Sequence, residues 1–85
     1  MIKIWGKIIA KEKIFKSVII EVDEENTTFF DMLRTISGEL NVPTPILLDK
    51  HVHDFNRFHI CQFKPDDFWD SVTFDSFILQ LMRGD

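Results

Sequence analysis

The stretch IKIWGKIIAKEKIFKSVIIEV, residues 2–22, alternates between two sets of side chains over most of its length. Alternation in a segment rich in β-branched residues predicts strands, because successive side chains of a strand point to opposite faces of a sheet. The charged triplet Lys11-Glu12-Lys13 is short enough to form the turn between two strands. The stretch therefore predicts an N-terminal β-hairpin, although it lacks the Asn-Gly or Asp-Gly pair that would fix the register.

The two faces of this predicted hairpin differ in composition. One face is aliphatic, whereas the opposite face carries two aromatic rings and two isoleucines, namely Trp5, Ile9, Phe15 and Ile19. A sheet face in water does not normally carry such a group. Either the C-terminal half of the chain covers these residues, or they form a surface for a partner.

A helix is predicted after the hairpin and its acidic end. Its apolar residues fall at helical spacing on one stripe, namely Phe29, Leu33, Ile36 and Leu40. Thr28 and Asp31 have the spacing of a capping box at its start. Gly38 or Asn41 can end it, and Pro43 prevents its continuation.

The elements that follow are less clearly marked. Thr44 and Pro45 can open a second helix over residues 45–56, although residues 46–48 also fit a short buried strand. Alternation predicts a strand over residues 57–63. A last strand is predicted over residues 77–82, where a helix beginning near Asp75 also fits the sequence.

These elements predict an α+β fold in a single compact domain, residues 1–85, with no linker. Splitting so short a chain would leave pieces too small to bury a core. The expected architecture is a hairpin and an amphipathic helix packed on a small mixed sheet. Its order of hairpin, helix and further strands resembles that of the β-grasp, or ubiquitin-like, layout. The resemblance is one of element order and implies no function.

The charge of the chain is unevenly distributed. Its formal net charge is −4, yet residues 1–22 contain five lysines and only two glutamates. The acidic remainder argues against a dedicated nucleic-acid binder, whose phosphate contacts need a basic face. Lys3, Trp5 and Lys7 nevertheless combine basic and aromatic side chains as single-strand binders do, so weak single-stranded nucleic-acid binding is an alternative.

The sequence predicts a cytoplasmic protein. Its single cysteine cannot form an internal disulfide, and no apolar run fits a signal peptide or a membrane span. The three glycines are too scattered for a phosphate-binding loop, and no small-molecule substrate is indicated.

The chemically richest stretch, residues 51–69, holds all three histidines and the only cysteine. His51, His53, His59 and Cys61 supply the nitrogen and sulfur donors that suit tetrahedral zinc. His59 and Cys61 would share a strand face, whereas a helix over 45–56 would separate His51 from His53. Zinc binding is therefore an alternative, and no cofactor is required.

A catalytic pairing of Cys61 with His59 or His53 lacks a glycine-rich turn that could build an oxyanion site. We therefore expect no enzyme. The surplus of aromatic residues favours a protein-interaction domain that binds a protein partner or forms a homodimer. Phe68 and Trp69, in the acidic segment 66–70, are a second candidate anchor. Alternatively, this acidic segment covers the basic hairpin.

Overall fold

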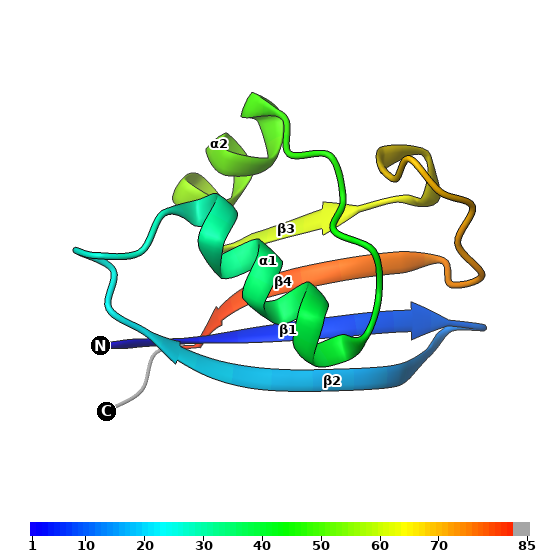
Figure 1. Ribbon diagram of the computed structural model, residues 1–85, viewed down its shortest axis with the longest axis horizontal. Coiled ribbons are helices and arrows are strands. Elements are labelled where there is room, and N and C mark those ends of the chain that lie inside the picture. Colours follow the sequence, from blue (N-terminus) through cyan, green and yellow to red (C-terminus); the bar gives the residue numbers. More distant parts are fainter. Residues whose placement is uncertain (83–85) are drawn as a thin grey trace.

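The computed structural model describes residues 1–82, which form two helices packed on a four-stranded sheet (Figure 1). The strands are β1 (Ile2–Ala10), β2 (Lys13–Val22), β3 (Ile60–Phe63) and β4 (Ser76–Met82). The helices are α1 (Phe29–Leu40) and α2 (Asp49–Phe58), and a 3-10 turn, η1 (Pro65–Asp67), follows β3. The α+β class and the N-terminal hairpin are confirmed. The last three residues of the expected domain lie outside the described residues.

The sheet has the order β2-β1-β4-β3 and is antiparallel throughout, so the prediction of a mixed sheet needs correction. The direction of β4 explains the difference. Segment 64–75 carries the chain from β3 to the hairpin-turn end of β1, where Ser76 pairs with Ile9 (Figure 1). From there β4 can only run back along β1, which makes the central pair antiparallel.

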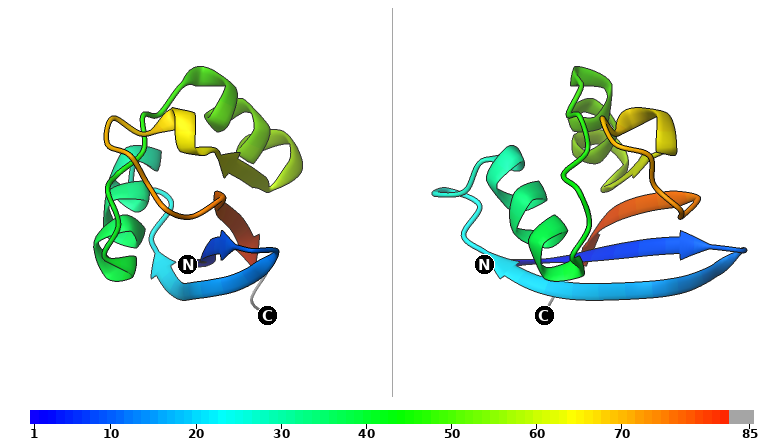
Figure 2. Two further views of the ribbon diagram at one scale, coloured as in Figure 1. Left: turned by 90° about the vertical axis from the view of Figure 1, so that its right-hand side faces the viewer. Right: turned by 45° about the vertical axis from the view of Figure 1, so that its right-hand side comes forward.

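Both helices lie on the same side of the sheet, as Figure 2 shows. The side chains between them and the sheet form one core of the described residues, and its most buried members include Ile4, Ile8, Leu33, Ile36, Phe63, Phe77 and Leu79. The strand residues in this group belong to the aliphatic face of β1 and its partners on β3 and β4. One of the two predicted faces of β1 is therefore buried, as expected for a sheet that a single layer of helices covers.

Helix α1 begins and ends where the sequence predicts. The Thr28 hydroxyl accepts a hydrogen bond from the Asp31 backbone N–H at 3.1 Å. Asn41 adopts a left-handed conformation with φ 57°, and its N–H donates to the carbonyl of Gly38 at 3.1 Å. Both contacts satisfy backbone groups that a helix end leaves unpaired.

Helix α2 begins four residues later than the predicted 45–56 and extends two residues further. The Ile46 N–H donates to the carbonyl of Asp67 at 2.6 Å, so the chain at Ile46 is tied to η1 before the helix starts. The helix ends with His59 in a left-handed conformation, φ 62°. The strand predicted over 57–63 therefore begins only at Ile60.

The β1–β2 turn places Lys11 and Glu12 at positive φ, 52° and 65°. Two-residue hairpin turns of this kind normally use Asn or Gly, because other side chains are strained there. Asp75 supports the turn by accepting a hydrogen bond from the Lys11 N–H at 2.9 Å. The Asp75 N–H in turn donates to the carbonyl of Ile9 at 2.8 Å. Tertiary contacts thus replace the missing local turn signal.

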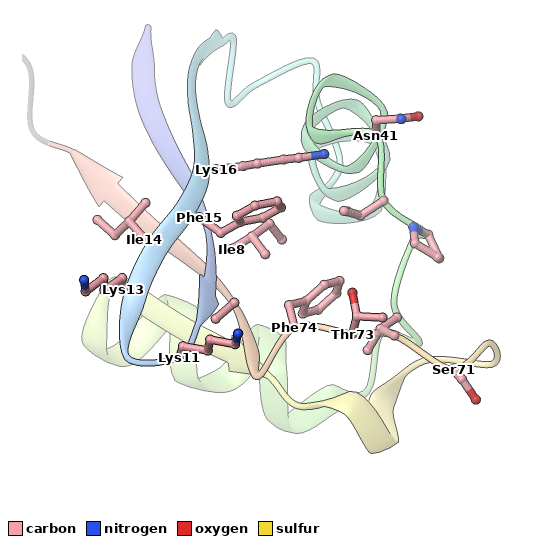
Figure 3. Close-up of a pocket in the computed structure, with 14 residues that line it drawn as sticks. Ile8, Lys11, Lys13, Ile14, Phe15, Lys16, Asn41, Ser71, Thr73 and Phe74 are labelled. Atoms are coloured by element: carbon pink, nitrogen blue, oxygen red, sulfur yellow. The ribbon is translucent and has the colours of Figure 1, made fainter.

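A β-bulge in β2 changes which side chains share a face. Ile8 pairs with Lys16, whereas Ile9 pairs with Ile14, which leaves Phe15 as an extra residue. The bulge turns Phe15 towards the helix side of the sheet (Figure 3). The prediction that Phe15 shares a face with Trp5 is therefore wrong, and Ile14 occupies that face instead.

Helix α1 crosses β1 closely at Gly6. A Cβ atom on Gly6 would overlap Cγ2 of Ile36, a fully buried side chain. Ile36 and Leu40 therefore pack directly on the backbone of the central strand. Gly38, in α1 itself, has open space around its Cα.

We expect Gly6→Ala to lower the free energy of unfolding by about 1–3 kcal/mol, because the new methyl group overpacks a full core. Gly38→Ala is the matched control and should raise stability by about 0.5–1 kcal/mol, since glycine is unfavourable inside a helix. Urea unfolding of the two variants measures both effects. Equal changes in both variants would contradict the close approach of α1 to β1.

Candidate protein-binding surface

The face of the sheet away from the helices is exposed and partly apolar. We call it the open face and define its apolar members as Trp5, Ile9, Ile14, Ile19, Ile60, Ile78 and Met82. Ile14 and Ile19 are each 51% exposed, and Ile60 is 39% exposed. All four strands contribute, so the apolar side chains extend across the sheet.

The centre of the open face is Trp5, which is half-buried among neighbouring strands. The Lys7 ammonium lies 4.2 Å from the centre of the Trp5 ring and donates to the Gln80 side-chain oxygen at 2.9 Å. This arrangement holds the ring in place by a cation–π contact and cross-strand packing. Trp5 is therefore a fixed aromatic group on a surface of mixed aliphatic and polar side chains.

The described part of the C-terminal half, up to Met82, does not cover the open face. Helix α2 and segment 64–75 both lie on the side of α1 (Figure 2). Of the two alternatives for the Trp5 face, intramolecular cover by the described residues is excluded. The sequence had pointed to Trp5, Ile9 and Ile19, but it missed the contributions of β3 and β4. The alternation within β3 and β4 assigns Ile60, Ile78 and Met82 to the open face only when the pairing of these strands with β1 is known.

The other predicted anchor divides into one buried and one exposed ring. Phe68 is 7% exposed and packs edge-on against Phe74, with ring centres 5.3 Å apart. Trp69 is 87% exposed. The prediction that both rings form an anchor needs correction: Phe68 belongs to the core, and Trp69 alone projects from the loop.

A pocket of about 810 Å³ opens at the hairpin end of the molecule, on the helix side of the sheet (Figure 3). Its apolar lining comes from β1, from the bulge in β2, from residues 42–43 after α1 and from residues 72–74. The charged residues that line it are all lysines, namely Lys11, Lys13 and Lys16. Four separate segments build this pocket, so no continuous motif could have predicted it.

The predicted zinc ligands do not come together. Within residues 1–82, no three His, Cys, Asp or Glu side chains lie close enough to hold a metal ion. His51 and Cys61 are buried, whereas His53 and His59 are exposed. His51 and His53 both belong to α2. Because they are two positions apart in the helix, their side chains lie on different sides of it.

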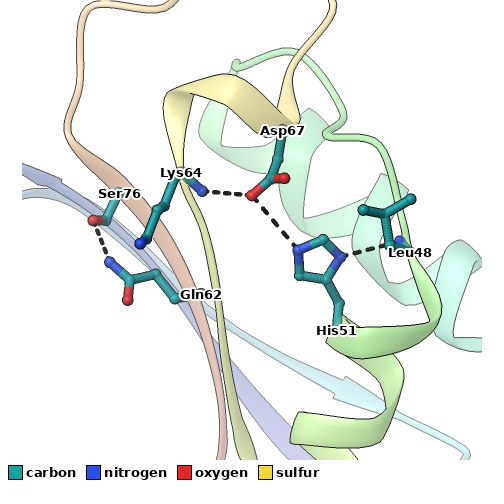
Figure 4. Close-up of polar contacts among 6 residues, drawn as sticks. All are labelled: Leu48, His51, Gln62, Lys64, Asp67 and Ser76. Atoms are coloured by element: carbon teal, nitrogen blue, oxygen red, sulfur yellow. Dashed lines mark hydrogen bonds and ion pairs between the residues drawn. The ribbon is translucent and has the colours of Figure 1, made fainter.

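His51 has a structural role at the start of α2 (Figure 4). Its Nδ1 accepts a hydrogen bond from the Leu48 N–H at 3.0 Å, which caps the helix. Its Nε2 faces the Asp67 carboxylate at 3.5 Å, an ion-pair distance too long for a hydrogen bond. Burial lowers the pKa of His51 below its ordinary 6.5, although Asp67 partly opposes this effect. The ring is therefore neutral at pH 7.

Cys61 faces the core from β3 and is 3% exposed. Burial, together with the nearby Asp54 carboxylate, raises the pKa of its thiol to about 12. A thiol that stays protonated is a poor nucleophile and a poor metal ligand. Cys61 therefore packs as a small apolar side chain.

No family model, curated protein or solved structure matches this chain. No helix among residues 1–82 is long and apolar enough to cross a membrane. The geometry of the surfaces is thus the basis for any functional proposal.

We expect the protein to lose stability as the pH falls below about 6.5, because histidine in the unfolded chain gains a proton that buried His51 resists. His51→Asn should reduce this loss, since its Oδ1 can still accept from Leu48 but does not titrate. Urea unfolding at pH 7.5 and pH 5.5 measures the difference. His53→Asn, on the exposed side of α2, is the control and should keep the wild-type pH dependence. A wild-type pH dependence in His51→Asn would contradict this role.

Proposed function

We propose that the protein is a non-enzymatic, cytoplasmic protein-interaction domain that binds a protein partner through the open face. The observation that carries the proposal is the exposed apolar surface on all four strands, with Ile14 and Ile19 each more than half exposed. Large apolar side chains exposed together on one face are costly in water and commonly mark an interaction site.

The composition of the open face suggests the chemistry of its partner. Trp5 supplies an anchor with a large apolar area, and the surrounding isoleucines can exclude water around it. Lys3 and Lys7 add positive charge, which Glu21 opposite Lys3 partly offsets. We therefore propose a largely apolar, mildly acidic protein surface as the partner, on another protein or on a second copy of this chain.

The two alternatives from the sequence have weaker support. Lys7, a proposed phosphate contact, already engages Trp5 and Gln80. A nucleic-acid function would require binding that weakens steeply with salt. A zinc function would require ligands beyond the dispersed His51, His53, His59 and Cys61.

A photo-crosslinking residue at Ser17, an exposed position beside Ile19 on β2, tests the proposal in the cells that make the protein. We expect a discrete protein adduct from this position. The same residue at His53, exposed on α2, should not give that adduct. The mass of the adduct distinguishes a second copy from another protein.

The variant Ile19→Lys provides the critical comparison. Because Ile19 is half exposed, we expect its unfolding free energy to change by less than about 1 kcal/mol. The adduct should nevertheless fall severalfold, since a charge now interrupts the apolar face. No adduct from Ser17, or one that Ile19→Lys leaves unchanged, would contradict the proposal.

A further inference from the structure

Two features on the helix side of the molecule have no role in the open face. One is Trp69, whose ring is 87% exposed. The other is the apolar pocket at the hairpin end. The Trp69 ring and the pocket are both apolar, and the residues around them carry opposite charges. The pocket is therefore a suitable binding site for the ring.

The pocket is apolar inside and positively charged around it. Phe15 forms one wall although it is 67% exposed, and Phe74 lies at the floor (Figure 3). Lys16 extends across the side nearest α1, where its ammonium donates to the carbonyl of Leu40 at 3.2 Å. Lys11 lies on the opposite side (Figure 3). No carboxylate lines the pocket, so it favours an apolar group attached to negative charge.

The loop that carries Trp69 has this character. Asp70 directly follows Trp69 and Asp66 precedes it by three residues, and both are exposed, so two carboxylates belong to the loop that carries the ring. The loop is held on both sides of Trp69, because Phe68 before it and Phe74 after it are buried and their ring centres lie 5.3 Å apart. A ring that is presented on a fixed loop loses little conformational entropy when it binds.

We propose that Trp69 of one copy inserts into the pocket of a second copy, and that the second copy returns the same contact. Trp69 lies two residues before Ser71, which lines the pocket, so the two sites are separated by at most about 7 Å of chain. A single twofold axis between two molecules can therefore place each loop at the other's pocket. Asp66 and Asp70 then approach Lys11 and Lys16 of the other copy.

The expected dimer is weak. Two indole rings bury on the order of 300–500 Å², whereas a stable interface buries about 1,200 Å² or more. Charge attraction across the rim makes the association salt-sensitive. The contact uses the helix side of the sheet. Ile14 belongs to the open face and also lines the pocket, but the other apolar members of the open face do not, so the contact does not depend on the proposed function.

Tryptophan fluorescence in a Trp5→Phe background reports on Trp69 alone. We expect its emission to shift to shorter wavelength as protein concentration rises, in step with a doubling of mass in sedimentation equilibrium. The dissociation constant should increase severalfold between about 50 mM and about 500 mM salt. A strict monomer with unshifted emission at millimolar concentration would overturn the proposal.

Complementary variants test the reciprocal contact. Trp69→Ala keeps the pocket and Phe15→Asp keeps the ring, and both residues are exposed, so both variants should fold. Each alone should weaken dimerisation more than about 10-fold, and an equal mixture should form a heterodimer through the one intact contact. Phe58→Ala, a change of an exposed ring on α2, is the control and should leave dimerisation unchanged.

Other occupants give different results. A blue-shifted emission that does not depend on concentration would place Trp69 in its own pocket and overturn the proposal. A dimer that persists in Trp69→Ala would also overturn it and would point to the open face. A small molecule that purifies with the protein and is retained in Trp69→Ala, with no dimer in either protein, would assign the pocket to that ligand instead.

Discussion

The close contact of α1 with β1 at Gly6 determines how this short chain distributes its apolar surface. Because the strand has no side chain there, Ile36 packs against its backbone. Helix α1 thus covers the β1–β2 half of the sheet, while α2 packs on β3 on the same side. The described residues provide one layer of helices, so only one face of the sheet acquires a core. The open face, with its apolar side chains, follows from that arrangement.

The pattern of the sequence predicts those elements that are defined by residues close together in the chain. Alternation identifies β1 and β2, and the stripe and caps of α1 identify both of its ends. The remaining boundaries depend on tertiary contacts that no local pattern records. Pro45 has the features of a helix start, yet the Ile46 N–H bonds to Asp67, more than twenty residues away. The bulge that turns Phe15 to the helix side likewise has no sequence signal.

The candidate site was only partly predictable for the same reason. Trp5 and Ile19 follow from alternation, but the pocket combines four segments that the fold brings together. The set of possible metal-donor residues was the least informative signal, because residue type does not say in which direction a side chain points. His51 caps α2, Cys61 fills the core, and the other two histidines remain in water. Burial and direction, rather than residue type, decide which of these side chains can bind anything.

The central claim is that the apolar open face is accessible to a partner. Isoleucine methyl NMR with a soluble paramagnetic probe tests it most directly, at protein concentrations low enough to keep the chain monomeric. We expect strong signal loss from Ile14 and Ile19 and little loss from Ile4, Ile8 and Ile36, which are 0–1% exposed. Protection of Ile14 and Ile19 equal to that of Ile4 would contradict the account, because the face would then be covered within the protein itself.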